Sequence, residues 1–177
     1  MPLILALDTA TTGCSVAAVD GASVIASENA RMARGQSEAL APMIERILQS
    51  CPRQPAAIAV TRGPGAFTGL RIGLAAARGL ALAFGIPCLG ISTFDVLAWQ
   101  VRRGGQVSGL PILVGIDSKR DDLYAQAFND QGRPLTPGEA LMPEYLPRLL
   151  SDGARRLAIA GDAQEAAMKV LVAARPD

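Results

Sequence analysis

Short apolar runs along the first half of the chain alternate with a segment of helical periodicity. Apolar runs at residues 3–7, 15–19 and 24–25 are separated by polar turns and predict a meander of three strands. From Ser37 the apolar positions recur at helical spacing, which predicts a helix over residues 37–50 with Ser37 as its N-cap. Its apolar face consists of Leu40, Met43, Ile44, Ile47 and Leu48.

The same reasoning extends to a glycine-rich boundary near the middle of the chain. Residues 57–60 and 87–91 predict strands, while residues 68–84, with Thr68 as N-cap, and 93–102 predict helices. Residues 104–109 contain three glycines and no apolar period, which is typical of a linker. The pattern therefore predicts an N-terminal subdomain over residues 1–103, a linker over 104–109 and a short C-terminal subdomain over 110–177.

The opening pattern recurs after the linker. Residues 4–9 and residues 113–118 both form an apolar run that ends in an aspartate, Asp8 or Asp117, followed by a hydroxyl residue. Each copy leads into a second predicted strand. This repeat implies an α/β protein with two related subdomains and a cleft between them. Each subdomain would place an aspartate at a strand end, where α/β folds bind ligands.

Composition excludes several kinds of chemistry. The 177 residues include no histidine, so a Ser-His-Asp or Cys-His catalytic unit and a histidine-ligated metal are excluded. A net charge of +1 disfavours autonomous binding of nucleic acid. Three dispersed cysteines without an export signal predict a soluble cytoplasmic protein with reduced, structural thiols. The apolar stretch 70–84 is interrupted by Arg71 and Arg78 and is too short to span a bilayer.

Three junctions carry groups that suit ligand binding. Asp8 with Thr9 and the following threonines could hold a hydrated cation or bound a phosphate, or Asp8 could cap its own turn. Asp117 occupies the equivalent place in the repeat. Gly161 and Asp162 follow a predicted strand and precede a predicted helix, a junction where an adenosine could rest.

The helix over residues 68–84 is the most informative element. Small residues recur every four positions and let another helix approach closely; they are Gly69, Gly73, Ala77, Ala81 and Gly85. The glycines preceding this helix match neither common phosphate-binding pattern, because no lysine lies near them. Because the helix is apolar nearly all round, it is either internal core or a partner interface.

Six motifs together resemble one family. They are Leu5-Ala-Leu-Asp-Thr-Ala-Thr11, Arg34-Gly-Gln-Ser-Glu38, Gly63-Pro-Gly-Ala-Phe-Thr-Gly-Leu-Arg-Ile-Gly73, Ile91-Ser-Thr-Phe94, Ile116-Asp-Ser-Lys-Arg120 with Tyr124, and Gly161-Asp-Ala163. This set, which covers nearly the whole chain, resembles the TsaB (YeaZ) family. The resemblance implies the duplicated ribonuclease-H-like fold of actin, Hsp70, acetate kinase and the sugar kinases. It also implies an accessory subunit in the synthesis of threonylcarbamoyladenosine in tRNA.

The resemblance further implies partners and an interface. The implied partners are the paralogue TsaD, which holds the metal and transfers the threonylcarbamoyl group, and the ATPase TsaE. A homodimer is expected in isolation, and tRNA is expected to bind only through the complex. The family interface uses the two helices over residues 37–50 and 68–84. Its predicted residues are Leu40, Met43, Ile47, Gly69, Leu70, Gly73, Leu74, Ala77 and Ala81.

No catalytic residue, metal site or cofactor of its own is expected for this chain. ATP or ADP with Mg²⁺ is the candidate ligand of a complex interface, with Asp8, Thr9, Asp117, Gly161 and Asp162 as candidate nucleotide-binding residues. The alternative is an ATP-hydrolysing enzyme of the same superfamily that uses Asp8 and Asp117. An arginine in place of Ala77 is expected to block TsaD binding while the chain stays folded.

One contrast with TsaD and two departures from the family pattern stand out. TsaD carries H-x-x-x-H after the strand that follows the long helix, whereas residues 92–96 here are Ser-Thr-Phe-Asp-Val. Gln36 stands where the family often has histidine. The family usually extends some tens of residues beyond the position of Asp162, so the second subdomain is expected to be short.

Overall fold

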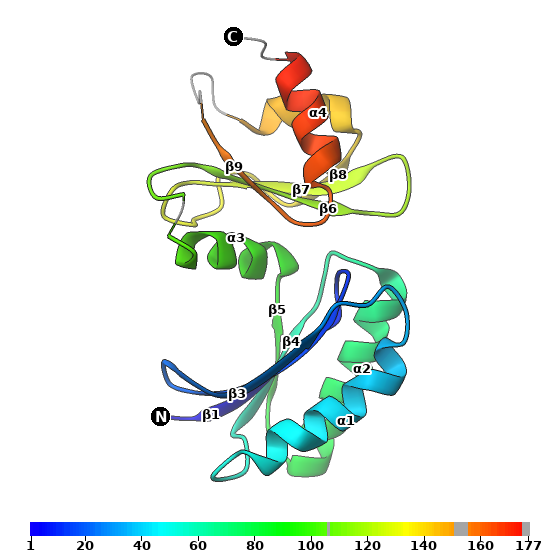
Figure 1. Ribbon diagram of the computed structural model, residues 1–177, viewed down its shortest axis with the longest axis vertical. Coiled ribbons are helices and arrows are strands. Elements are labelled where there is room, and N and C mark those ends of the chain that lie inside the picture. The colour runs from blue at the N-terminus through cyan, green and yellow to red at the C-terminus, as the bar shows by residue number, and fades with distance from the viewer. Residues whose placement is uncertain (106, 151–155, 175–177) are drawn as a thin grey trace. The chain divides into compact units, whose positions relative to one another are not determined.

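The computed structural model describes residues 1–177 except 106, 151–155 and 175–177. The contacts divide the chain into two compact units, Met1–Ser92 and Thr93–Asp177. Each unit is an α/β layer structure built on its own sheet, shown from blue to green and from green to red in Figure 1.

The first unit contains five strands and two helices. Its elements are β1 (Leu3–Asp8), β2 (Cys14–Asp20), β3 (Ser23–Ala30), α1 (Gln36–Gln49), β4 (Ala57–Thr61), α2 (Phe67–Phe84) and β5 (Cys88–Ile91). The sheet has the order β3-β2-β1-β4-β5, with an antiparallel meander β1–β3 and with β4 and β5 parallel to β1. This order confirms the predicted meander followed by strand-helix-strand connections.

One face of this sheet is covered by both helices (Figure 1). Strands β1 and β2 alternate buried and half-buried residues, as a strand with one covered face requires. Their buried residues pack against the predicted apolar face of α1 and against the small residues of α2. The core therefore lies between the sheet and the two helices.

The second unit repeats the first part of this topology. Its elements are α3 (Thr93–Arg103), β6 (Ile112–Asp117), β7 (Leu123–Phe128), β8 (Glu139–Leu141), the 3₁₀ helix Pro143–Leu149, β9 (Ala158–Ala160) and α4 (Gln164–Ala174). The order β8-β7-β6-β9 has the same directions as β3-β2-β1-β4. The duplication predicted from two aspartate-ended strands is confirmed, and the fold is the duplicated ribonuclease-H-like fold.

Helices cover both faces of the second sheet. The helix α4 and the 3₁₀ helix pack against one side, and α3 packs against the other. Strand β6 is accordingly buried almost throughout instead of alternating.

The predicted boundary at residues 104–109 is therefore wrong by one helix. Phe94 and Ala98 of α3 join the core cluster of β6, so residues 93–103 belong to the second unit and not to the first. The glycine-rich residues 104–109 belong to a loop inside the second unit. Gln106 of this segment lies outside the described residues.

Both predicted helix caps are also wrong. Helix α1 begins at Gln36 with Gly35 as its N-cap, at a φ of 94°. The Ser37 hydroxyl donates to the Glu38 carboxylate instead of capping the backbone. Helix α2 begins at Phe67 with Ala66 as its N-cap, so Thr68 lies inside the helix.

Candidate functional site

Asp8 ends β1 beside the end of the parallel strand β4. Its Oδ1 accepts hydrogen bonds from the Ala10 backbone N–H at 2.9 Å and from the Thr61 hydroxyl at 2.7 Å. The first bond is the turn-capping role considered for Asp8, and the second joins the two strand ends. The side chain is half-buried. Asp8 therefore organises the carboxyl edge of the first sheet.

Thr9 takes a structural role. It is buried, and its hydroxyl donates to the Gly69 carbonyl oxygen at 2.7 Å. The Ala66 N–H donates to the Ala10 carbonyl oxygen at 2.7 Å. These bonds attach the start of α2 to the loop after β1. The Thr9 hydroxyl thus binds the protein itself, which does not favour its predicted role toward a nucleotide.

The glycine motif before and within α2 allows this close approach. A Cβ on Gly69 would lie 2.1 Å from the Thr9 carbonyl oxygen, and one on Gly65 would lie 2.2 Å from the Ala10 carbonyl oxygen. A Cβ on Gly73 would lie 2.5 Å from the Thr9 hydroxyl oxygen. These separations are far below van der Waals contact. The motif therefore serves helix-to-loop packing, whereas the sequence indicated packing against another helix.

Asp117 has a comparable place in the second unit but a different environment. Its Oδ1 accepts from the Lys119 backbone N–H at 2.6 Å and its Oδ2 from Lys119 Nζ at 2.7 Å. Its own N–H donates to Asp162 Oδ1 at 2.8 Å. The side-chain and backbone hydrogen bonds from Lys119 lower the pKa of the Asp117 carboxyl, and the bond to Asp117 raises the pKa of Lys119. The fold thus brings together Asp117 and Asp162, two of the candidate nucleotide-binding residues, and the Lys119 ammonium pairs with the Asp117 carboxylate.

Gly161 makes the junction after β9 possible. Its φ is 101°, and a Cβ there would lie 1.9 Å from the Gly115 carbonyl oxygen of β6. The same carbonyl oxygen accepts from the Ala163 N–H at 3.2 Å. Gly161 is therefore explained by chain packing, and the exposed Asp162 is the polar group that this junction presents.

These carboxylates do not present a ready Mg²⁺ site. Within residues 1–105, 107–150 and 156–174, no three cysteine, aspartate or glutamate side chains are grouped as metal ligands. Mg²⁺ requires several free oxygen ligands in octahedral geometry. At Asp117 the ammonium of Lys119 occupies the carboxylate on which such a cation would bind. A cation binding at Asp117 would have to displace this ammonium group.

Asp117→Asn is expected to lower the free energy of unfolding at pH 7 by less than about 1 kcal/mol, because this ion pair is largely exposed. The folded pKa of Asp117 is depressed, so its stabilisation is present above the unfolded pKa of about 3.9 and is lost as pH falls through the folded pKa. Urea unfolding of the wild type and of Asp117→Asn at neutral and acidic pH measures the difference in their free energies of unfolding. If that difference persists in strong acid, it does not come from the ionised Asp117 carboxylate.

Most of the predicted partner-interface residues are internal. Leu40, Met43 and Ile47 lie in the core beneath α1, and Leu70 and Leu74 are half-buried. The small-residue row Gly69, Gly73, Ala77 and Ala81 is the buried face of α2. It packs against β1 and β4 because its small side chains let the helix approach the sheet. The interpretation of this row as an interface was wrong, and its alternative, internal core, is correct.

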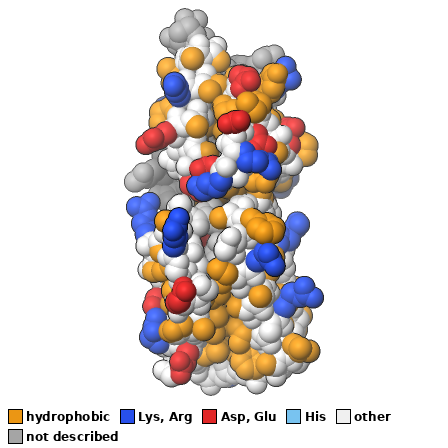
Figure 2. Space-filling model, turned by 90° about the vertical axis from the view of Figure 1, so that its right-hand side faces the viewer, with side chains coloured by type: hydrophobic (Ala, Val, Ile, Leu, Met, Phe, Trp, Pro, Cys, Tyr) orange, Lys and Arg blue, Asp and Glu red, His pale blue; other side chains and the backbone are white. Residues whose placement is uncertain are grey.

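The other face of α2 remains exposed and is rich in apolar residues. Phe67 is 72% exposed and Leu82 is 85% exposed, and both lie on α2. Ala75, Gly79 and Ala83 of the same helix are also exposed. Figure 2 shows hydrophobic side chains gathered on the side of the first unit where α1 and α2 lie. We call the set Phe67, Ala75, Leu82 and Ala83 the α2 outer face.

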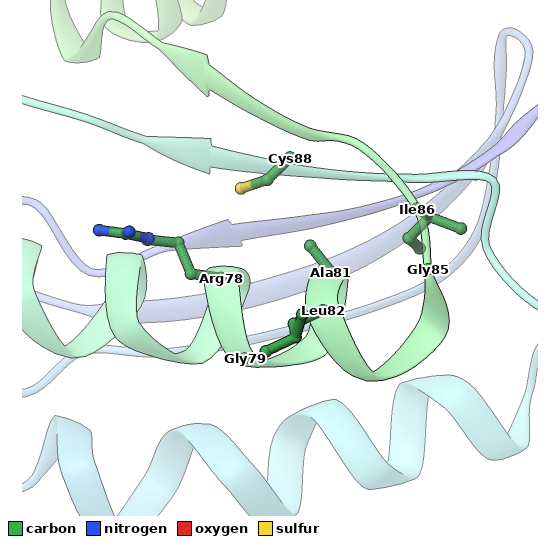
Figure 3. Close-up of a pocket in the computed structure, with 7 residues that line it drawn as sticks. All are labelled: Arg78, Gly79, Ala81, Leu82, Gly85, Ile86 and Cys88. Atoms are coloured by element: carbon green, nitrogen blue, oxygen red, sulfur yellow. The ribbon is translucent and has the colours of Figure 1, made fainter.

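A hollow of about 630 Å³ adjoins this face at the end of α2. It is lined by Arg78, Gly79, Ala81, Leu82, Gly85, Ile86 and Cys88. Figure 3 shows Ala81 on α2 and Cys88 at the start of β5 with their side chains facing each other, while the Arg78 side chain extends along α2. Arg78 is the charged residue among those that line the hollow. Cys88 is exposed, whereas a structural role was predicted for all three cysteines. The hollow offers apolar contact area and no acid-base pair.

Among the described helices, α2 alone is long and apolar enough to cross a membrane by length and composition, with a mean hydropathy of 1.3. Its small-residue face packs on β1 and β4 within the first unit. That packing accounts for part of its apolar character.

Comparisons with known proteins agree with this fold. The family of the tRNA N6-adenosine threonylcarbamoyltransferase TsaD matches residues 24–144. The crystal structure of YeaZ from Pseudomonas aeruginosa superposes with a TM-score of 0.75 at 28% identity and covers 99% of this chain and 93% of that one. The chain is thus one of the duplicated ribonuclease-H-like proteins related to this transferase.

Sequence relatives give the particular family. The chain is 32% identical over 158 residues to the tRNA threonylcarbamoyladenosine biosynthesis protein TsaB of Escherichia coli. The alignment covers 87% of this chain and 67% of that protein. With Haemophilus influenzae TsaB it is 34% identical over 125 residues, which is 68% of this chain and 51% of the relative. The chain belongs to the TsaB family, and it spans about half to two thirds of the length of these relatives.

Proposed function

We propose that this chain is a noncatalytic subunit that supports threonylcarbamoyladenosine modification of tRNA by binding a TsaD transferase through the α2 outer face. The observation that carries the proposal is the exposure of Phe67 and Leu82 on a helix whose opposite face is core. Large exposed apolar side chains on one helix face mark an interaction surface. The family relationship supplies the identity of the partner.

The chemistry of the candidate site supports an accessory role. Asp8 is engaged by Thr61 and its own turn, and Asp117 by Lys119. The full sequence contains no histidine that could serve as a general base or metal ligand at neutral pH. Catalysis is therefore assigned to TsaD, and ATP turnover to TsaE. The same apolar face is expected to form a homodimer in isolation, and the protein is expected to work in the cytoplasm with tRNA bound by the complex.

Leu82→Glu is expected to weaken TsaD binding at least a hundredfold, about 3 kcal/mol, because it removes an anchor and places a charge in the interface. Val172→Glu is the matched control, since Val172 is 63% exposed on α4 of the second unit and takes the same change in charge. Analytical gel filtration with TsaD of the same organism measures both variants.

The same variants test the function itself. Modification of unmodified tRNA by TsaD and TsaE is measured with the chain omitted, with the wild type and with each variant. The expected result is little modification without the chain or with Leu82→Glu, and wild-type modification with Val172→Glu. Full modification without the chain contradicts the accessory role, and wild-type binding by Leu82→Glu contradicts the interface.

A further inference from the structure

The end of α3 carries an exposed aromatic ring covered by an arginine. Trp99 is 54% exposed, and the Arg103 guanidinium lies over its ring, 5.0 Å from the ring centroid. The two residues are one turn apart on α3, so the helix itself holds the pair together. Trp99 is the single tryptophan of the chain. A half-exposed indole offers a large aromatic face on which a partner can stack.

Two further arginines extend this positive surface within the second unit. Arg102 lies against the turn at Gly132, where a Cβ would be 2.7 Å from Arg102 Cδ and 3.0 Å from its Nη1. Arg133 is exposed at the next position of that turn. The ion pairs formed among the described residues involve Arg46, Arg53, Lys119 and Arg120, and none includes Arg102, Arg103 or Arg133. Arg103 thus covers the exposed indole, Arg102 precedes Arg103 on α3, and Arg133 lies in the turn that Arg102 contacts.

The local charge is positive even after the neighbouring acids are counted. Asp130 in the same turn and the exposed Asp95, one turn before Trp99 on α3, offset two of the three guanidinium groups. The whole-chain charge of +1 does not show that this remaining positive charge lies beside the indole. We call Trp99, Arg102, Arg103 and Arg133 the α3 basic cluster.

We infer that the α3 basic cluster is a contact surface for single-stranded RNA, with an unpaired base stacked on the Trp99–Arg103 pair and adjacent phosphates bound by Arg102 and Arg133. The inference rests on the proposed function, since it assigns part of the tRNA contact to this chain. Aromatic rings accept any base by stacking, and arginines bind the flanking phosphates. An acidic protein segment would use the arginines but has no comparable use for the exposed indole.

Tryptophan fluorescence provides a direct test, because the whole signal comes from Trp99. The full chain is titrated with a single-stranded oligouridylate of about twelve nucleotides, a length within the site sizes of single-strand-binding domains. We expect saturable quenching with micromolar affinity at low salt. The logarithm of the affinity should fall with the logarithm of salt concentration with a slope of about −1.4, since the two phosphate-binding arginines each contribute about −0.7.

Matched charge reversals locate the site. Arg102→Glu is expected to weaken oligouridylate binding about tenfold or more, because it turns a phosphate-binding group into a repulsive one. Lys169→Glu, the same reversal on the exposed surface of α4, should change it less than about twofold. Both positions are exposed, and circular dichroism verifies that each variant is folded. Trp99→Ala should lower the affinity for oligouridylate about tenfold, because the stacking is lost. A labelled oligouridylate reports this binding, since the variant has no tryptophan.

Three results overturn the inference. They are absence of quenching at low salt, equal losses with Arg102→Glu and Lys169→Glu, and equally strong quenching by polyglutamate, which identifies a surface for acidic proteins. Gel filtration of Arg102→Glu with TsaD separates the two proposals. If Arg102→Glu binds both TsaD and oligouridylate as the wild type does, the RNA surface is rejected and the proposed function stands. If the wild-type chain fails to bind TsaD, the proposed function is rejected.

Discussion

Replacing Ala77 by arginine unfolds the first unit. Ala77 is 0% exposed and lies in the core between α2 and the sheet. An arginine there places a long charged side chain where neither space nor a partner exists, which costs about 4 kcal/mol or more. This expectation replaces the one drawn from sequence, in which the same substitution only blocked TsaD binding.

Ala75→Arg is the matched control on the same helix. Ala75 is exposed on the α2 outer face, so its arginine variant should remain folded and should lose TsaD binding instead. Urea unfolding followed by circular dichroism, together with gel filtration, measures both. If Ala77→Arg keeps the wild-type urea midpoint, the assignment of the two faces of α2 is reversed.

Gly69→Ala is expected to destabilise the chain by about 2 kcal/mol or more, because the added methyl group overlaps the Thr9 backbone oxygen and forces α2 away from β1. The backbone of a loop held by hydrogen bonds to α2 cannot simply rotate aside. Urea unfolding measures the loss.

Gly79→Ala supplies the contrast within one helix. A Cβ on Gly79 has nothing within 4 Å, so alanine there should stabilise by about 0.5 to 1 kcal/mol through helix propensity alone. Equal effects of the two substitutions would show that the glycines act through propensity and that the close contact with Thr9 is unimportant.

The duplicated fold could be predicted because it depends on local patterns. In both halves an apolar strand ends in an aspartate, Asp8 or Asp117, and a residue with a hydroxyl group follows it. A period of two marks a strand and a period of 3.6 marks a helix wherever it packs. The hydrogen bond from the Asp117 N–H to Asp162 could not be predicted in this way, because it depends on the parallel pairing of β6 with β9.

The faces of α2 could not be predicted in the same way. Small residues at every fourth position indicate close packing, but they pack equally well on a sheet of the same chain or on a foreign helix. The contact of Gly69 and Gly73 with Thr9 joins residues about sixty positions apart. Sequence spacing carries no information about such a distant neighbour.

The α3 basic cluster was missed for a related reason. Trp99 and Arg103 are one helical turn apart and could have been paired from sequence, whereas Arg102 meets the turn at Gly132 only through folding of the second unit. The assignment of α3 to that unit likewise depends on where Phe94 is buried. Local periodicity therefore establishes which elements form and in what repeated order. Long-range packing establishes which face of each element is free, because burial depends on residues that the chain brings together from far apart.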